Sequence, residues 1–322
     1  MLDKALILLI KKELKKIKTR YEEKYGAVIF DVKAKSFNGV IVLDGVVLSE
    51  KQKNEVFLAT KEIIKNSKVE NKIKVLSDSK NKLEIGWGVI TAEVADIWAK
   101  LSDKKNIIGK TRASQALKGD FVRILARKGN WRLAQTCDLA IGWINKYQVS
   151  SIKYQVSDKK WIKGKRAKKN EILRIRLTKD VQKKFICFLK KYLNSRYLLG
   201  GMTERGIDCS GLAQKFYSDI FGILLPRHSG DQALCGEKIE HEAAHFGDLV
   251  FLRRRASKQA HIGVVIKKNQ KSIPITRDKN QNLGDFLVLS AMRESGGVVI
   301  ENLSEILKYY NLISIKRIIS SC

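Results

Sequence analysis

The segment Gly206–Gly222 limits the fold more narrowly than any other part of this 322-residue chain. Its apolar residues recur at helical spacing, at Leu212, Phe216, Tyr217 and Ile220. The glycine at position 222 ends the pattern, so Cys209 lies in the first turn of a predicted helix. Free backbone N–H groups and the positive end of the helix dipole stabilise a thiolate there. The sequence therefore predicts a lowered pKa for Cys209.

Five short motifs follow one another around this cysteine. Tyr197-x-x-Gly-Gly201 and Asp208-Cys-Ser-Gly211 come first, then Leu225-Pro-Arg227, then Gly247-Asp-Leu-Val-Phe251 and His261-Ile-Gly-Val-Val265. In order and spacing, over about 125 residues, the set resembles the NlpC family of papain-type cysteine peptidases. The resemblance implies a papain-like α+β domain, in which the nucleophile helix packs on an antiparallel sheet that carries the histidine.

The same resemblance implies roles for individual residues. Members of the family cleave the peptide stems of bacterial cell wall, commonly at γ-D-glutamyl–diamino acid bonds. By position, Cys209 attacks the carbonyl group, His261 takes and returns the proton, and Tyr197 donates to the oxyanion beside the Cys209 N–H group. The implied substrate-binding residues are Asp208, Ser210, His228 and Ser229.

Two positions depart from the family pattern. Ser290, placed by alignment of the Gly-Gly-Val run at 296–298, stands where members carry His, Asn or Gln to orient the base. A serine hydroxyl reaches less far, so we expect reduced activity. Related dipeptidyl enzymes grip a free α-amine with an acidic residue and a tyrosine. Those places hold Thr111 and Ala140 here, which argues against a narrow amine specificity.

Upstream of the catalytic domain, expected at residues 178–322, the sequence predicts three segments. Residues 1–85 show the patterns of a helix, two strands, a second helix and a third strand, in a small α+β module that resembles BON-type docking modules. Residues 86–150 contain short β runs with Gly-Trp corners, and resemble the bacterial SH3-like β-barrels that precede NlpC domains. Residues 151–177 are expected to form a basic linker or hairpin.

The composition bears on partners. Lys and Arg number 63 against 33 Asp and Glu, which gives a net charge of +30. Such a field attracts anionic polymers, including cell-wall material and nucleic acid. The charge is spread along the chain and forms no separate arm, so solvated lysine faces explain it equally well. We expect peptidoglycan stem peptides and anionic polymers as partners, and no specific nucleic acid.

Cysteine spacing and the N-terminus bear on location. The five cysteines include no C-x-x-C pair, which argues against a disulfide scaffold or a zinc ribbon. The apolar run Ala5–Ile10 is too short for a membrane span or a signal-peptide core. We therefore expect a cytoplasmic location and no membrane span, and the sequence indicates neither a cofactor nor a bound metal.

Two other functions remain open. The same fold, weakened at Ser290, would suit a non-catalytic module that grips anionic wall material or a partner. A zinc peptidase is the other, because His241-Glu-Ala-Ala-His245 matches a motif with two ligands one helical turn apart. That chemistry needs a sustained helix, which Gly247-Asp248 interrupts, and a third ligand, for which His228 is the remaining histidine.

Overall fold

The computed structural model describes residues 2–25, 29–37, 39–47, 50–64, 68–75, 86–99, 112–162, 164–257, 259–272 and 284–321. The chain divides into two compact units. Unit 1 consists of Met1–Asn106, Leu117–Gln135 and Ile141–Gln155, and unit 2 of Ile107–Ala116, Thr136–Ala140 and Val156–Cys322. Two upstream segments, 107–116 and 136–140, thus belong to the same unit as the C-terminal part. The expected boundaries had placed both segments in the β region at 86–150. Those boundaries stay predictions.

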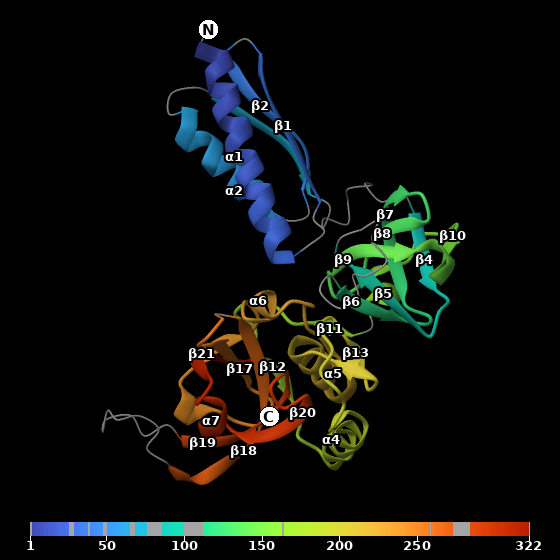
Figure 1. Ribbon diagram of the computed structural model, residues 1–322, viewed down its shortest axis with the longest axis vertical. Helices are drawn as coiled ribbons and strands as arrows, with labels where there is room; N and C mark the ends of the chain where they lie inside the picture. The colour runs from blue at the N-terminus through green and yellow to red at the C-terminus, as the bar shows by residue number, and fades with distance from the viewer. Residues whose placement is uncertain are drawn as a thin grey trace. The chain divides into compact units, whose positions relative to one another are not determined.

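The N-terminal part of unit 1 has the predicted order of elements (Figure 1). They are α1 (Leu2–Tyr25), β1 (Phe30–Phe37), β2 (Val40–Val47), α2 (Glu50–Ile64) and β3 (Lys68–Val75). Strand β2 pairs antiparallel with β1 and parallel with β3. Helix α1 buries Ile10, Leu14 and Ile17, which share one helical face, in a core with the sheet and α2. The likeness to BON-type modules stays a prediction.

The rest of unit 1 is mainly β structure. Its strands are β4 (Gly86–Ile90), β5 (Val94–Trp98), β7 (Phe121–Lys128), β8 (Trp131–Gln135), β9 (Ile141–Asn145) and β10 (Val149–Ile152), with the short 3-10 helix η1 (Lys146–Gln148). They pair antiparallel in the order β10-β4-β7-β8-β9-β5. The short strands agree with the short β runs predicted for residues 86–150. Gly142 lies where two strands approach closely, because a Cβ there would be 2.6 Å from the Trp98 carbonyl oxygen. The assignment as an SH3-like barrel stays a prediction.

Unit 2 is built on a six-stranded antiparallel sheet of order β16-β21-β17-β18-β19-β20. The strands are β16 (Glu237–Ile239), β17 (Leu249–Arg254), β18 (Ala260–Ser272), β19 (Gly284–Met292), β20 (Gly297–Asn302) and β21 (Tyr310–Arg317). Helix α5 (Cys209–Phe221) packs on β18 and β19, and α4 (Lys179–Tyr192) packs on α5 (Figure 1). The mixed α/β character of the C-terminal part is confirmed.

Local sequence explains where the two helices begin and end. Thr178 caps α4 by accepting from the Val181 N–H group, and Asp208 caps α5 by accepting from Gly211. Gly222 ends α5 in the left-handed conformation, at φ 66°. The predicted helix start at Cys209 is therefore confirmed.

Alternating side chains cover both faces of the sheet. Leu249, Val264 and Leu289 point into a core shared with α4 and α5. Their neighbours Val250 and Val265 point into a second core on the other face, which α7 (Leu303–Ile306) helps to close. This period of two is the reason that a histidine near the start of β18 has a fixed direction relative to α5.

In the basic segment 151–177, expected as a linker or hairpin, two short strands pair with distant parts of the chain. After α3 (Asp158–Trp161), strand β11 (Lys165–Arg166) pairs parallel with β15 (Ile223–Leu224). Strand β12 (Leu173–Ile175) pairs parallel with β22 (Ile319–Ser321). Both strands pair with distant strands of unit 2 instead of with each other. Residues 156–177 belong to unit 2, whereas residues 151–155 belong to unit 1.

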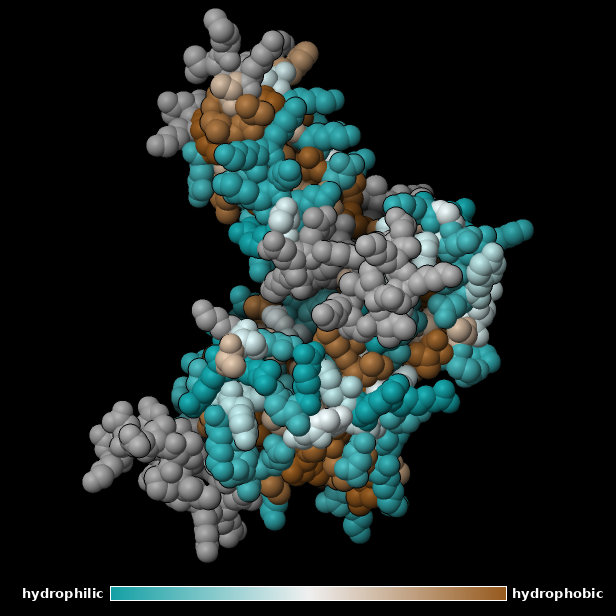
Figure 2. Space-filling view, viewed as in Figure 1, coloured by the Kyte–Doolittle hydropathy of each residue, from teal (hydrophilic) through white to brown (hydrophobic). Residues whose placement is uncertain are grey.

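The face of the molecule drawn in Figure 2 is mainly polar. Hydrophilic residues dominate the visible face, interrupted by smaller apolar areas (Figure 2). This agrees with a chain that has 63 Lys and Arg residues. Within the described ranges, no helix is both long and apolar enough to cross a membrane.

Candidate active site

A small pocket at the start of α5 contains two of the predicted catalytic residues, Cys209 and His261, and the predicted oxyanion donor, Tyr197. Cys209 is the first residue of α5, His261 is the second residue of β18, and Tyr197 lies on the loop after α4. The full lining is Tyr197, Cys209, Gln259, Ala260, His261, Arg293, Glu294 and Tyr310. The backbone N–H group of Ile262 also donates to the Cys209 thiol. A thiol, an imidazole and a phenol from distant parts of the chain therefore meet in one pocket.

The pKa of Cys209 is shifted in the direction opposite to that predicted. Burial raises it to about 12, and the Asp208 carboxylate adds to the rise. The Arg227 guanidinium and the N–H groups of Ile262 and Ser210 favour the thiolate, but they do not outweigh burial. Position at a helix start is thus insufficient to produce a thiolate here, and the resting thiol is neutral.

His261 is held as a neutral base. The side chain is buried, and its ring packs against the Tyr310 ring with centroids 4.9 Å apart. Burial lowers the pKa of His261 to about 4, while the Glu294 carboxylate opposes this shift. The Glu294 carboxylate accepts a hydrogen bond from the Tyr310 hydroxyl at 2.9 Å and forms an ion pair with Arg254 at 2.9 Å. A neutral imidazole beside a neutral thiol can accept the thiol proton as the sulfur attacks.

Acid should destabilise the fold through His261. Its ordinary pKa is 6.5 and its folded pKa is about 4. Between these values the unfolded chain binds a proton that the folded chain excludes. The stabilisation is present above pH 6.5 and is lost as the pH falls through 4, about 3 kcal/mol in full. We expect urea unfolding at pH 7 and 4.5 to show that His261→Gln loses about 2.5 kcal/mol less on acidification than the wild type. Equal losses would contradict this assignment.

Ser290 does not orient the imidazole through a hydrogen bond. Its side chain is buried on β19, beside Gly263, which follows His261 by two residues on β18. The Ser290 hydroxyl and His261 Nε2 are both buried, and neither has a hydrogen-bond partner within the described ranges. The short serine side chain leaves the imidazole nitrogen unpaired, and packing against Tyr310 holds the ring instead.

Tyr197 is suited to donate a hydrogen bond. Its backbone N–H group bonds the Gly296 carbonyl oxygen at 2.7 Å. The Arg293 guanidinium lies 5.4 Å from the centre of its ring. Burial raises the pKa of the phenol, and the Asp208 carboxylate adds to the rise, so the hydroxyl keeps its proton. Its role at the oxyanion stays a prediction.

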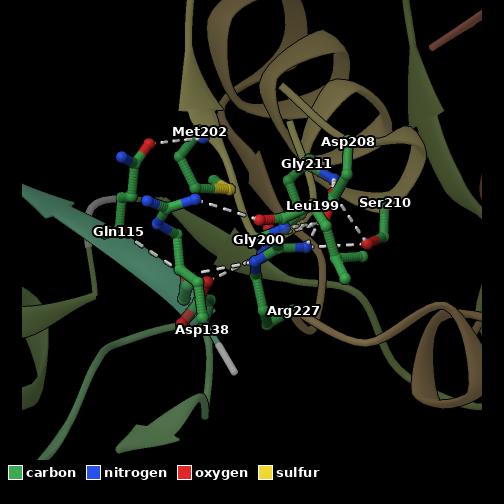
Figure 3. Close-up of polar contacts among 12 residues, drawn as sticks. Gln115, Asp138, Leu199, Gly200, Met202, Asp208, Ser210, Gly211 and Arg227 are labelled. Atoms are coloured by element: carbon green, nitrogen blue, oxygen red, sulfur yellow. Dashed lines mark hydrogen bonds and ion pairs between the residues drawn. The ribbon is translucent and has the colours of Figure 1, made fainter. Parts of the chain in front are cut away.

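The predicted substrate-binding residues Asp208 and Ser210 are engaged inside the protein (Figure 3). They are only 5% and 8% exposed, and neither lines the pocket. Both Asp208 oxygens bond Arg227, and the Ser210 hydroxyl lies 2.7 Å from the same guanidinium. Their described contacts therefore hold the nucleophile turn together instead of facing the pocket.

His228, Ser229 and Ala140 are also not among the residues that line the pocket. His228 precedes α6 (Ser229–Gln232), and burial, followed by the neighbouring Arg227 charge, lowers its pKa. Ser229 is the first residue of that short helix. Ala140 is fully buried in unit 2, and Thr111 lies outside the described residues.

The zinc-peptidase motif does not form the geometry that this chemistry needs. The 3-10 helix η2 spans only His241–Ala243, and His245 lies beyond its end. His241 Nε2 lies 2.8 Å from the Glu242 carboxylate. Across the described ranges, no three His, Cys, Asp or Glu side chains gather as a possible metal site. The two histidines are thus not one α-helical turn apart.

Sequence reasoning gave no role to four residues at or behind the pocket. They are Arg227, Arg293, Glu294 and Tyr310. A signal existed for Arg227, which stands in the Leu-Pro-Arg motif. Tyr310 had none, because it reaches the site only through the pairing of β17 with β21, where it lies opposite Arg254.

Together these groups can carry out acyl transfer to a thiol. Residues 194–316 match the model of the NlpC/P60 family. This part of the chain is therefore an NlpC/P60 domain, and the peptidases of that family are hydrolases. The match includes Tyr197, Cys209 and His261.

Curated relatives are similar over the same part. A "Probable endopeptidase NlpC homolog" of Haemophilus influenzae is 45% identical over 80 residues, 25% of this chain and 42% of the relative. "Murein DD-endopeptidase MepS/Murein LD-carboxypeptidase" of Escherichia coli K12 is 37% identical over 91 residues, 28% of this chain and 48% of the relative. "Gamma-D-glutamyl-L-lysine dipeptidyl-peptidase" of Bacillus subtilis is 34% identical over 77 residues, 23% of this chain and 26% of the relative. The chain thus spans about half the length, or less, of these relatives.

Proposed function

We propose that this protein is a cysteine peptidase that hydrolyses peptidoglycan-derived peptides, at γ-D-glutamyl–diamino acid bonds. The proposal depends on one observation, that Tyr197, Cys209 and His261 line a single pocket of an NlpC/P60 domain. The names of the relatives support the substrate class, since one is a murein endopeptidase and another a γ-D-glutamyl-L-lysine peptidase.

The resting groups define the order of proton transfers. The neutral His261 imidazole takes the thiol proton while Cys209 sulfur forms a bond to the γ-carbonyl carbon. The oxyanion accepts hydrogen bonds from the Tyr197 hydroxyl and the Cys209 N–H group. His261 returns the proton to the amine as the carbon–nitrogen bond breaks, which leaves a thioester. Water, deprotonated by His261, then releases the carboxylic acid and restores the thiol.

A direct assay tests this function. Full-length protein is incubated with a γ-D-glutamyl–diamino acid peptide, and the products are identified by mass spectrometry. We expect cleavage at the γ-amide bond, at the same rate before and after exhaustive chelation, because the nucleophile is a thiol. A rate abolished by chelation and restored by zinc would instead favour chemistry at His241 and His245.

A specific observation supports a second candidate, a non-catalytic binding module. His261 Nε2 has no orienting partner within the described ranges, and the Cys209 thiol rests neutral. A binder would retain affinity for muropeptides without releasing product. Calorimetric titration beside the product assay separates the two candidates.

Location and charge add two subordinate proposals. We propose action in the cytoplasm, on recycled or imported muropeptides. The net charge of +30 supports additional binding of anionic polymers, which salt would weaken steeply.

A further inference from the structure

A buried ion pair lies directly next to the nucleophile in sequence (Figure 3). Asp208, the residue before Cys209, pairs with Arg227 through two parallel contacts. Nη1 lies 3.0 Å from Oδ1, and Nη2 lies 2.7 Å from Oδ2. Arg227 is only 2% exposed. A charged pair this deeply buried persists because each partner satisfies the other, and removal of one leaves a costly unpaired charge.

The pair fixes the backbone on both sides of Cys209. Asp208 Oδ2 accepts from the Gly200 N–H group at 2.7 Å, and Oδ1 accepts from Gly211 at 2.7 Å. Arg227 uses two further donors on Ser210, at 2.7 Å, and on a second hydroxyl described below. One guanidinium–carboxylate fork therefore joins the loop at 200 to the first turn of α5.

Upstream segment 112–116, in the same unit, reaches this fork. Ser114 accepts from Arg227 Nε at 3.1 Å, and Gln115 accepts from the Met202 N–H group at 2.9 Å. A Cβ at Gly200 would lie 2.6 Å from the Arg112 carbonyl oxygen, which shows how closely these two segments approach each other. Contacts from segment 112–116 therefore hold the loop that precedes the nucleophile. This segment lies outside residues 194–316, which match the family model.

Segment 136–140 supports the fork from another direction. The Asp138 carbonyl oxygen accepts from the Arg227 N–H group at 3.0 Å. Its carboxylate accepts from Gln214, in the second turn of α5, at 3.0 Å. Asp138 thus connects the backbone that carries Arg227 with the helix that carries Cys209.

Charge adds to geometry. Negative charge develops on the Cys209 sulfur during attack, and the neighbouring Asp208 carboxylate opposes it. The Arg227 guanidinium offsets that carboxylate. Loss of the fork would both loosen the nucleophile turn and expose the sulfur to an uncompensated negative charge.

We propose that Arg227 is a positioning residue that, through Asp208, fixes the backbone around Cys209, and that Ser114 and Asp138 hold Arg227 in place. Its effect on turnover rests on the proposed peptidase function. Its effect on the thiol does not, so the two can fail separately.

The test compares Arg227→Lys with Arg317→Lys in the full chain. Arg317 makes a matched two-contact pair with Asp248, at 3.1 and 2.8 Å in the same unit, but does not line the pocket. Lysine cannot reproduce a two-pronged contact. We expect Arg227→Lys to lower kcat about 100-fold with KM changed less than about threefold, the scale of effect for a displaced reacting group. Arg317→Lys should change kcat less than about threefold.

Two further readouts exclude a general loss of stability. Added guanidinium should raise the kcat of Arg227→Ala at least about tenfold, whereas an equal concentration of sodium chloride should not. Alkylation of Cys209 by iodoacetamide at pH 9, followed by peptide mapping, should slow about tenfold in Arg227→Lys and remain unchanged in Arg317→Lys. This second readout needs no peptidase activity.

Three results would overturn the proposal. One is a raised KM with unchanged kcat in Arg227→Lys, which would make Arg227 a substrate contact. Another is an equal loss of kcat in the two lysine variants. The third is an unchanged rate of Cys209 alkylation in Arg227→Lys. If the wild type cleaves no muropeptide while the alkylation rates still differ as expected, the proposed function fails and the positioning role stands.

Discussion

Replacing Cys209 with alanine should lower kcat for a γ-D-glutamyl–diamino acid peptide at least about 10⁴-fold, since loss of a catalytic nucleophile has effects of this order. The remaining pocket would still bind the peptide, so its dissociation constant should change little. Single-turnover cleavage followed by mass spectrometry measures the first quantity, and calorimetric titration the second.

Cys235→Ala is the matched control. Cys235 is buried in the same unit, but its sulfur contacts the Ala167 and Asp231 carbonyl oxygens and does not line the pocket. We expect Cys235→Ala to retain kcat within about threefold. Substantial turnover in Cys209→Ala would show that another group makes the bond to the carbonyl carbon.

Ser290→Asn should raise kcat about tenfold or more, because it supplies the missing partner for His261. The orienting group of a catalytic histidine fixes its tautomer and steadies the imidazolium, and its loss can cost several orders of magnitude. The amide of asparagine reaches further than a hydroxyl and has an oxygen that accepts an N–H group. Only part of the full effect is expected, because Ser290 is 1% exposed and a larger side chain must find room.

Ser290→Val separates hydrogen bonding from packing. Valine is, like asparagine, larger than serine, but its side chain has no polar atom, so Ser290→Val should not raise kcat. Because the native hydroxyl has no hydrogen-bond partner within the described ranges, Ser290→Ala should leave kcat within about twofold. An increase with valine, or none with asparagine in a folded protein, would mean that another contact orients His261.

The part of the site that depends on local spacing could be predicted. The apolar repeat after Cys209 and the glycine at 222 place a helix start there, and the structure confirms it. The order of the five motifs placed His261 and Tyr197 near that start, and all three line the pocket. These inferences succeed because each depends on residues that are close in sequence or on a fixed order of motifs.

Long-range packing could not be predicted. Tyr310 faces His261 only because β21 pairs with β17, and no nearby residue signals this. The pKa of Cys209 follows from burial, which the capping pattern does not reveal. Segments 112–116 and 136–140 lie among the short β runs predicted for residues 86–150. Nothing in their composition therefore indicates contacts with the nucleophile turn.

Reaction with a thiol-directed γ-D-glutamyl peptide electrophile tests most directly whether Cys209 is the nucleophile. The fraction modified at each of the five cysteines is measured by peptide mapping, beside the residual turnover of the same samples. We expect modification at Cys209, with turnover lost in proportion to it and the other four thiols largely unmodified. Full turnover in a sample whose Cys209 is completely modified, or inactivation that follows modification of a different cysteine, would contradict the proposed mechanism.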